Sequence, residues 1–475
     1  MSNALRNLAI VISIGINSPA IARTLVTSTT KNTSSLNKYI KERGYQNAQL
    51  NAVTKLFDNT NTGVWIYSEL QGHDIEVLVP KALTSDDLMD LLLKVRTAKS
   101  LGAERITVVF EDQVDEIRFN QSSDTWIIEH IENLFTVAGA NSIKEPLHRR
   151  RIARTFPSGK PTAKPKEIYI AGDSQHPSEL MKDIASHLKV KVIDLNMSES
   201  LENTHILYMA SSTPPVNKNF FQILKGVYEL KQRGARVTLI SPYLPYARSD
   251  KKDHKGVAVA GRLIADLIES VQTDSILFAR AHAPQSEGFF SIPVFHVSGR
   301  ETISRALAKQ GVQLIVSPDA GFQKDATTYA VKLGLPVAVV NKQRDNETSE
   351  TLLRDISGPP VTGLVVAIVD DETASGGTLA KVAAFLKKNG AAKVITSVTH
   401  LAGKAEKALV SPDIDAIVVT NTLPIDSKII DKTIEHGNPT NMKLEVISIA
   451  PEIARSLQSL RNSILKHDPC NIIFK

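Results

Sequence analysis

The sequence has one cysteine, Cys470, which excludes an internal disulfide framework and favours a reducing compartment. The apolar run at residues 8–16 is too short to span a bilayer, and the N-terminus lacks a cleavage-like site. We therefore predict a buried strand there, a cytoplasmic location and no membrane partner. Aromatic residues make up only 5% of the chain, so the net charge of +6 does not indicate nucleic-acid binding, which needs stacking platforms for bases. Small phosphorylated ligands explain the basic surplus more simply.

A chain of 475 residues is too long for one core, and the pattern predicts an α/β protein with more than one domain. In residues 1–150, predicted strands alternate with predicted helices. The strands are expected at residues 64–67, 75–79 and 106–110, and the helices at residues 85–101 and 126–138. Helices between strands imply parallel sheets flanked by helices, a Rossmann-like arrangement.

Residues 151–166 form a predicted linker, because three prolines and a glycine among polar residues interrupt the alternation. The linker region is also basic, with Arg149, Arg150, Arg151, Arg154, Lys160, Lys164 and Lys166. A second domain is predicted at residues 167–310 and a third at residues 311–475. Residues 91–107 align with residues 223–238 with one insertion, so we infer an internal duplication, with chance agreement of two helix-to-strand units as the alternative.

The third domain contains the stretch that points most directly to function. A β-rich run at residues 364–369 leads into Asp370 and Asp371, then into small residues, then into a helical pattern that stops at Gly390. The small residues let backbone N–H groups converge on an anion at a helix start, and the paired carboxylates suit two neighbouring sugar hydroxyls. Ribose 5-phosphate has both a phosphate group and two neighbouring hydroxyls. A plain helix cap and turn is the alternative.

This stretch resembles the phosphoribosyl-diphosphate (PRPP) loop of the type I phosphoribosyltransferase fold. Three further segments, at residues 243–252, 282–293 and 317–321, narrow the resemblance to ribose-phosphate diphosphokinases, the PRPP synthetases. The resemblance covers roughly residues 166 to 465. It implies tandem phosphoribosyltransferase-like domains related by pseudo-symmetry, and it leaves the first domain as an extra, degenerate N-terminal-like copy.

The resemblance also implies roles for individual residues. His282 and Asp319 match metal-associated positions for Mg²⁺, and His282 with Lys342 and Arg344 would be catalytic, the latter two holding the transferring phosphates. The polar segment at residues 345–351 suits a lid. Arg248 matches an ATP-contacting arginine, and Ser249 replaces the usual glutamine. The sugar-phosphate site would comprise Asp370, Asp371, Ala374, Ser375, Gly376, Gly377 and Thr378.

Several positions depart from the family pattern. Arg280 stands where aspartate is usual, which reverses the local charge and is expected to weaken metal binding; Ala374 replaces an acidic or hydroxylated residue. The second domain lacks the family's adenine-recognising hairpin, but the first domain keeps its register with Phe57, Asn59 and Asn61. In the family this hairpin reaches into a neighbouring subunit. Our hypothesis is that the first domain supplies it in cis; the alternative is that this domain has lost its ligand and only makes interfaces.

The leading interpretation is Mg²⁺-dependent transfer of diphosphate from ATP to ribose 5-phosphate, giving PRPP and AMP, in a homo-oligomeric enzyme. Three alternatives stay open. The acceptor is a larger 5-phosphoribosyl compound such as ADP-ribose; or the protein is a phosphoribosyltransferase that consumes PRPP; or it is a non-catalytic regulatory subunit associated with PRPP synthetase. The intact Asp370 and Asp371, together with Lys342 and Arg344, argue against complete loss of activity.

Overall fold

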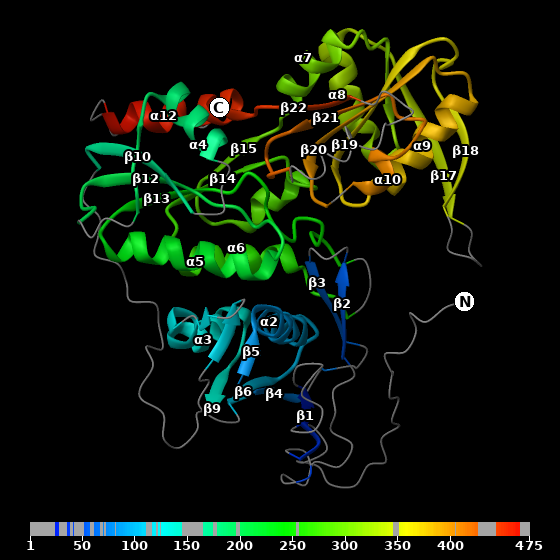
Figure 1. Cartoon of the computed structure of the whole chain (residues 1–475). Helices are drawn as coiled ribbons and strands as arrows, with labels where there is room; N and C mark the ends of the chain where they lie inside the picture. The colour runs from blue at the N-terminus through cyan, green and yellow to red at the C-terminus, as the bar shows by residue number, and fades with distance from the viewer. Residues whose placement is uncertain are drawn as a thin grey trace.

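Figure 1 shows the computed structural model of the chain. It describes residues 24–27, 36–38, 41, 52–57, 61–66, 70, 73–80, 82–110, 116–119, 122–123, 125–144, 165–173, 178–195, 200–252, 256–344, 351–403, 405–425 and 443–465. The predicted strand at residues 8–16, Cys470, Asn59 and most of the predicted linker lie outside this part of the chain. Within it, no helix has the length and apolar character needed to cross a membrane.

The first sheet is built from four parallel strands in the order β1-β4-β6-β9. They are β1 (Thr24–Thr27), β4 (Asp74–Val79), β6 (Arg105–Phe110) and β9 (Ser142–Lys144). Two helices cover one face: α2 (Ser85–Ser100), which begins with a capping box between Thr84 and Asp87, and α3 (Thr125–Ala138). A small three-stranded sheet of β5 (Ala82–Thr84), β7 (Glu116–Phe119) and β8 (Ser122–Ser123) lies beside them.

The second sheet has six parallel strands in the order β11-β10-β12-β13-β14-β15. They are β10 (Glu167–Gly172), β11 (Lys191–Val192), β12 (Thr204–Met209), β13 (Arg236–Ile240), β14 (Ser275–Ala279) and β15 (Val294–Val297). Helices α5 (Val216–Gln232) and α6 (Ala260–Ser270) cover one face, and α4 (Ser178–Leu188) lies on the other. Because both faces are covered, the strands are apolar almost throughout.

The first two sheets repeat each other in detail. The order β1-β4-β6-β9 corresponds to β10-β12-β13-β14, and the helices α2 and α3 correspond to α5 and α6. Equivalent hydrogen bonds recur: Thr107 Oγ1 lies 2.8 Å from Ser142 Oγ, and Thr238 Oγ1 lies 2.6 Å from Ser275 Oγ. The inferred duplication therefore extends beyond the aligned residues to topology and side-chain contacts.

The third sheet has seven strands in the order β18-β17-β16-β19-β20-β21-β22, parallel except where β18 pairs with β17. They are β16 (Leu314–Ser317), β17 (Val337–Arg344), β18 (Thr351–Ser357), β19 (Val365–Thr373), β20 (Lys393–Leu401), β21 (Ala416–Thr420) and β22 (Lys443–Ile447). One face packs on α7 (Arg300–Lys309) and α8 (Gln323–Leu333), the other on α9 (Gly377–Lys388) and α10 (Glu406–Leu409).

The last helix of the described residues, α12 (Ala450–Leu465), follows the third sheet in the chain but packs on the second sheet, against α4, β10 and β15. It joins the apolar cluster that contains Ile170 and Leu207. Conversely, α7 belongs by position to the predicted second domain, but its Ile303 and Leu307 are buried against the third sheet. The two units therefore exchange helices, and Figure 1 shows α12 lying over β10 and β15.

The α/β fold class is confirmed, whereas some element boundaries differ from prediction. The strand predicted at residues 64–67 lies in an antiparallel hairpin of β2 (Ala52–Phe57) and β3 (Asn61–Ile66), not in a parallel sheet. The run at residues 364–369 continues to Thr373, because β20 pairs with it along its length. Likewise β17 continues to Arg344, because β18 pairs with it.

Candidate active site

The predicted phosphate loop joins β19 to α9, as expected. Its carbonyl groups are held from behind, because Ala405 N–H donates to the Ala374 carbonyl at 2.8 Å and Lys407 N–H to the Ser375 carbonyl at 3.0 Å. Gly376 has φ +76°, and a Cβ there would lie 2.5 Å from the Cβ of Ala408, so only glycine fits. This packing leaves the side chains of Ser375 and of Thr378, on the first turn of α9, exposed.

Three consecutive acids lie one residue before the end of β19. Asp371 and Glu372 are buried, while Asp370 is partly buried. Burial and the neighbouring Asp371 carboxylate raise the pKa of Asp370 well above its ordinary value. Burial raises the pKa of Asp371 as well, but the hydrogen bonds with His282 and Asp370 and the nearby charges of His282 and Arg280 together outweigh burial and leave that pKa well below its ordinary value. The two predicted sugar-binding carboxylates therefore have opposite protonation tendencies.

The second domain supplies cations to this acidic edge. His282 Nδ1 lies 2.5 Å from Asp371 Oδ2, and Arg248 Nε lies 2.8 Å from Glu372 Oε1. The hydrogen bond to Asp371 raises the pKa of His282, an effect that burial partly opposes. The structure thus brings the predicted His282 and Arg248 to the predicted phosphate-loop strand. Glu372 was not predicted as a partner, although its place directly after two aspartates was a visible signal.

The loop after β16 carries Asp319, which caps the short 3₁₀ helix η3 (Ala320–Phe322) by accepting from Phe322 N–H at 3.1 Å. Its other oxygen, Oδ2, accepts from Lys342 Nζ at 3.0 Å. Asp319 also contributes to the raised pKa of Asp370, so these carboxylates lie near one another. Arg344 ends β17, two residues beyond Lys342. The pair predicted to hold phosphates therefore stands on a β-hairpin arm.

The two predicted metal ligands are engaged separately, His282 by Asp371 and Asp319 by Lys342. Among the described residues, no group of three or more His, Cys, Asp or Glu side chains is arranged to hold a metal ion. The donors still suit Mg²⁺, which typically uses one or two carboxylates together with substrate phosphates rather than a cage of protein ligands. Asp319, whose side chain is 41% exposed, has the right chemistry for such a ligand.

Arg280 was expected to act on the metal site, but its side chain pairs with another residue. Its guanidinium is buried, with 2% exposure, and pairs with Asp325 Oδ2 of α8 at 2.7 Å. It also lies over the Phe322 ring, 5.4 Å from the centroid, and Arg300 pairs with the same Asp325. The charge of Arg280 is therefore largely neutralised within a contact between the second and third domains. The charge of Arg280 therefore does not reverse the charge of the metal site as expected. Its remaining effect there is to help lower the pKa of Asp371.

His400 is a further residue at this junction that the sequence reasoning missed. It is fully buried on β20, and burial lowers its pKa to about 4, so the ring is neutral near pH 7. Nδ1 lies 2.8 Å from Thr422 Oγ1, while Nε2 lies 3.0 Å from the Arg280 carbonyl oxygen. The ring therefore ties the third sheet to the end of β14. Its only sequence signal was its place at the end of the β-rich run at residues 394–399.

The predicted ATP-contacting residues are placed in part. Ser249 uses its hydroxyl within its own loop, accepting from Ala260 N–H at 3.0 Å. Phe57 and Asn61 pair across the end of the β2–β3 hairpin, and Asn59 lies in the turn outside the described residues. Figure 1 shows this hairpin standing beneath the junction of the second and third domains.

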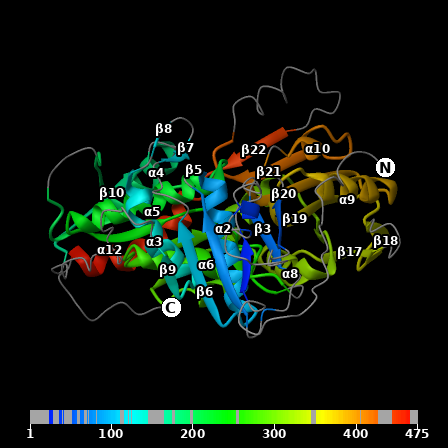
Figure 2. The same ribbon diagram turned by 90° about the horizontal axis from the view of Figure 1, so that it is seen from below.

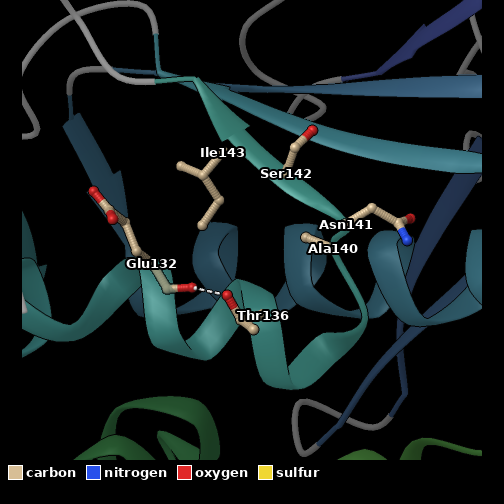
Figure 3. Close-up of a pocket in the computed structure, with 6 residues that line it drawn as sticks. All are labelled: Glu132, Thr136, Ala140, Asn141, Ser142 and Ile143. Carbon is tan, nitrogen blue, oxygen red and sulfur yellow. Dashed lines mark hydrogen bonds between the residues drawn. The ribbon is translucent and has the colours of Figure 1, made fainter. Parts of the chain in front are cut away.

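A cavity of about 220 Å³ lies elsewhere, in the first domain, and contains none of the predicted site residues. Figure 3 shows its lining of Glu132, Thr136, Ala140, Asn141, Ser142 and Ile143. Its polar groups serve the fold: the Thr136 hydroxyl donates to the Glu132 carbonyl at 2.9 Å, and Asn141 Oδ1 accepts from Ile106 N–H at 2.9 Å. The acidic edge of the third sheet therefore remains the candidate site.

A parallel sheet whose central strand ends in acids and a small-residue loop defines a protein of the phosphoribosyltransferase class. Residues 301–431 match the family described as "Phosphoribosyl transferase domain", and residues 170–271 match "N-terminal domain of ribose phosphate pyrophosphokinase". The chain therefore belongs to the ribose-phosphate pyrophosphokinase family, a family of transferase enzymes. Both matched ranges lie after the first domain.

Individual relatives agree with this assignment. The chain is 31% identical over 310 residues to ribose-phosphate pyrophosphokinase from Aquifex aeolicus, covering 62% of this chain and 95% of the relative. It is 32% identical over 321 residues to the same enzyme from Streptomyces coelicolor, covering 63% and 95%. The crystal structure of phosphoribosylpyrophosphate synthetase from Mycobacterium smegmatis matches with a TM-score of 0.53 and 28% identity, covering 64% of this chain and all of that one.

Proposed function

We propose that the protein transfers the diphosphoryl group of ATP to the C1 hydroxyl of ribose 5-phosphate, forming PRPP and AMP. The observation that carries the proposal is the edge of β19, where three acids and a braced phosphate loop meet His282 and Arg248 of the second domain. Family membership supports the same reaction class.

In this proposal the loop at residues 374–378 binds the 5-phosphate, with the exposed Ser375 and Thr378 hydroxyls and the start of α9 facing the anion. Asp370 and Asp371 hold the sugar hydroxyls. The two acids are unequal, because Asp371 accepts from His282 and Asp370 has the raised pKa. Asp371 is thereby oriented by a cross-domain hydrogen bond before any sugar binds.

Arg248, Lys342 and Arg344 neutralise the triphosphate. The C1 oxygen attacks the β-phosphorus, the bond from that phosphorus to the α-phosphate oxygen breaks, AMP leaves, and the hydroxyl proton is released. Such transfers depend on positioning and charge compensation rather than on covalent catalysis. Without a ligand, Lys342 pairs with Asp319 and Arg248 pairs with Glu372. Binding of ATP would therefore replace these carboxylates by phosphate groups as partners of the two cations.

Mg²⁺ is the metal we propose, with Asp319 and His282 as its protein contacts. When bound, it would neutralise phosphate charge and orient the diphosphoryl group. We further propose a cytoplasmic location, an adenine contact by Phe57, Asn59 and Asn61, and assembly of the enzyme into a homo-oligomer.

The test is AMP release by purified protein with ATP and Mg²⁺, comparing ribose 5-phosphate with ADP-ribose as acceptor. AMP release with ribose 5-phosphate supports the proposal. AMP release with ADP-ribose alone would show that the acceptor is the larger compound and not ribose 5-phosphate. No AMP release with either acceptor would favour the regulatory alternative. Lys342→Ala serves as the inactive control, because it removes a cation proposed to hold the phosphates from a half-buried position of β17 that lies outside the apolar core.

A further inference from the structure

The first domain packs on the second in the way that a second copy of the second domain would pack in a two-fold dimer. In a two-fold interface each element meets its own equivalent, and cross contacts occur in both directions. The described helices follow this rule: α2 contacts its equivalent α5, α3 contacts its equivalent α6, and the cross pairs α2 with α6 and α3 with α5 also touch. Figure 1 shows these helices forming the layer between the two sheets, and in Figure 2, seen from below, α2 and α3 overlap α5 and α6.

The contact is extensive and partly apolar, since a single buried cluster runs from Leu92 of α2 to Leu224 of α5. Polar pairs hold its margin. Arg96 pairs with Asp266 and also donates to the Val137 carbonyl at 3.0 Å. Separation of the two domains would expose this apolar surface and take from Arg96 its carboxylate partner, so the first domain covers the α5–α6 face.

The first domain also holds the loop that carries Arg248, and it does so at both ends. At the near end, Tyr246 OH donates to Asn217 Oδ1 at 2.6 Å, and Asn217 Nδ2 donates to Asp86 Oδ1 of α2 at 2.8 Å. Tyr246 and Asn217 are 1% and 3% exposed, so their hydrogen bond is shielded from water, whereas Asp86 at the other end of the relay is exposed. It fixes the backbone two residues before Arg248.

At the far end, Ile66 N–H of the β2–β3 hairpin donates to the Gly256 carbonyl at 2.9 Å. A Cβ on Gly256 would lie 2.1 Å from the Ile66 carbonyl oxygen, so the two backbones meet only because this residue is glycine. Between these anchors, Ser249 N–H donates to the Tyr246 carbonyl at 2.9 Å, closing the turn that presents Arg248.

We infer that the first domain is a tethered pseudo-partner: it occupies the α5–α6 face in place of a second copy of this chain, and it positions Arg248 from both ends of its loop. The second half of this inference rests on the proposed function, because it assigns Arg248 to the polyphosphate of ATP. Its consequence is that any homo-oligomer must assemble through another surface.

The first test uses kinetics and a matched pair of glycines. Gly256→Ala introduces the collision with the hairpin, whereas Gly311→Ala has the same kind of left-handed backbone, φ +69° against +89°, and nothing within 4 Å of the added Cβ. We expect Gly256→Ala to raise KM for ATP at least fivefold with kcat changed less than twofold, and Gly311→Ala to change neither. Equal KM values for the two variants would overturn the positioning role. Asp86→Ala, which cuts the relay from the first-domain side, provides the same readout if Gly256→Ala does not fold.

The second test needs no activity, so it separates failure of this inference from failure of the proposed function. In a Cys470→Ser background, Ser100→Cys of the first domain and Lys252→Cys of the second are joined by a short bis-maleimide, since both residues are exposed and Lys252 Nζ lies 3.5 Å from the Ser100 carbonyl oxygen. We expect a cross-linked product of monomer size on a denaturing gel. A cross-linked dimer would show that a second chain occupies the face, and absence of cross-linking would show that the contact does not form; either result overturns the inference.

Discussion

The shared carboxylate between Arg280 and Arg300 gives a quantitative prediction about the junction of the second and third domains. Among the described residues, Asp325 is the only acid that pairs with both arginines, and Asp325→Asn removes its charge. The Arg280 guanidinium, which is 2% exposed, then has no counter-charge. Breaking a buried pair costs about 3–5 kcal/mol. Because Asp325 itself is 24% exposed, water relieves part of this cost, and we expect a loss of about 2–4 kcal/mol.

Arg280→Met is the matched variant. It removes one arginine but leaves Asp325 paired with Arg300, and methionine keeps an apolar contact with Phe322. We expect this variant to lose about 0–2 kcal/mol, since replacing a buried ion by an apolar side chain is often close to neutral. The double variant Arg280→Met/Asp325→Asn should be more stable than Asp325→Asn alone, because no unpaired cation then remains buried at position 280.

Calorimetry measures the order of the three variants. With about 2–4 °C per kcal/mol for domains of this size, Asp325→Asn should lower the Tm of the transition that involves the second and third domains by roughly 5–15 °C. The reasoning would be refuted if Arg280→Met were the less stable single variant, or if the double variant lost the sum of the two single losses. The first outcome would mean that the arginine carries packing rather than charge; the second, that the two residues are not coupled.

Three further predictions concern pH, the phosphate loop and the metal. His400 is buried and its pKa in the folded protein is lowered to about 4. As the pH falls, this histidine is therefore protonated in the unfolded chain before it is protonated in the folded one. Stability should therefore decline from about pH 6.5 towards pH 4 by on the order of 3 kcal/mol, and urea titrations should show a shallower decline for His400→Gln; parallel curves would contradict this. Gly376→Ala should raise KM for ribose 5-phosphate more than tenfold, because its Cβ would meet Ala408, whereas Gly363→Ala, with φ +73° and open space, should leave it unchanged. AMP release should stop with EDTA and return with excess Mg²⁺, and activity that persists through chelation would exclude the proposed metal.

The parts of the fold that depend on local pattern could be predicted from the sequence. The strand that ends in acids, the small-residue loop and the helix after it form one continuous segment, β19 to α9, and periodicity is sufficient to identify such a segment. The repeat between the first two domains was also visible, because Lys99, Gly102 and Thr107 recur as Lys231, Gly234 and Thr238. The structure adds the matching strand order to that alignment.

The contacts between domains could not be predicted, because they join residues far apart in the chain. Glu372 holds Arg248, and Asp325 holds Arg280, across the second and third domains. Nothing in the local sequence of Arg280 indicates that an acid on α8 neutralises it, so its charge was expected to act on the metal site. The β2–β3 hairpin agrees with the hairpin register expected around Phe57 and Asn61, but its contact with Gly256 of the second domain joins residues far apart in the chain and had no signal in the sequence.

The return of α12 to the second sheet has a consequence for biosynthesis. Ile453 and Leu457 of this helix complete the apolar layer over Ile170, although nearly three hundred residues separate them along the chain. While the polypeptide is being made, α4 covers that side of the second sheet only in part until α12 has left the ribosome. A product that stops before α12 would expose the apolar side chains of Ile170 and Leu207, and we expect it to bind chaperones more strongly than a chain that includes this helix.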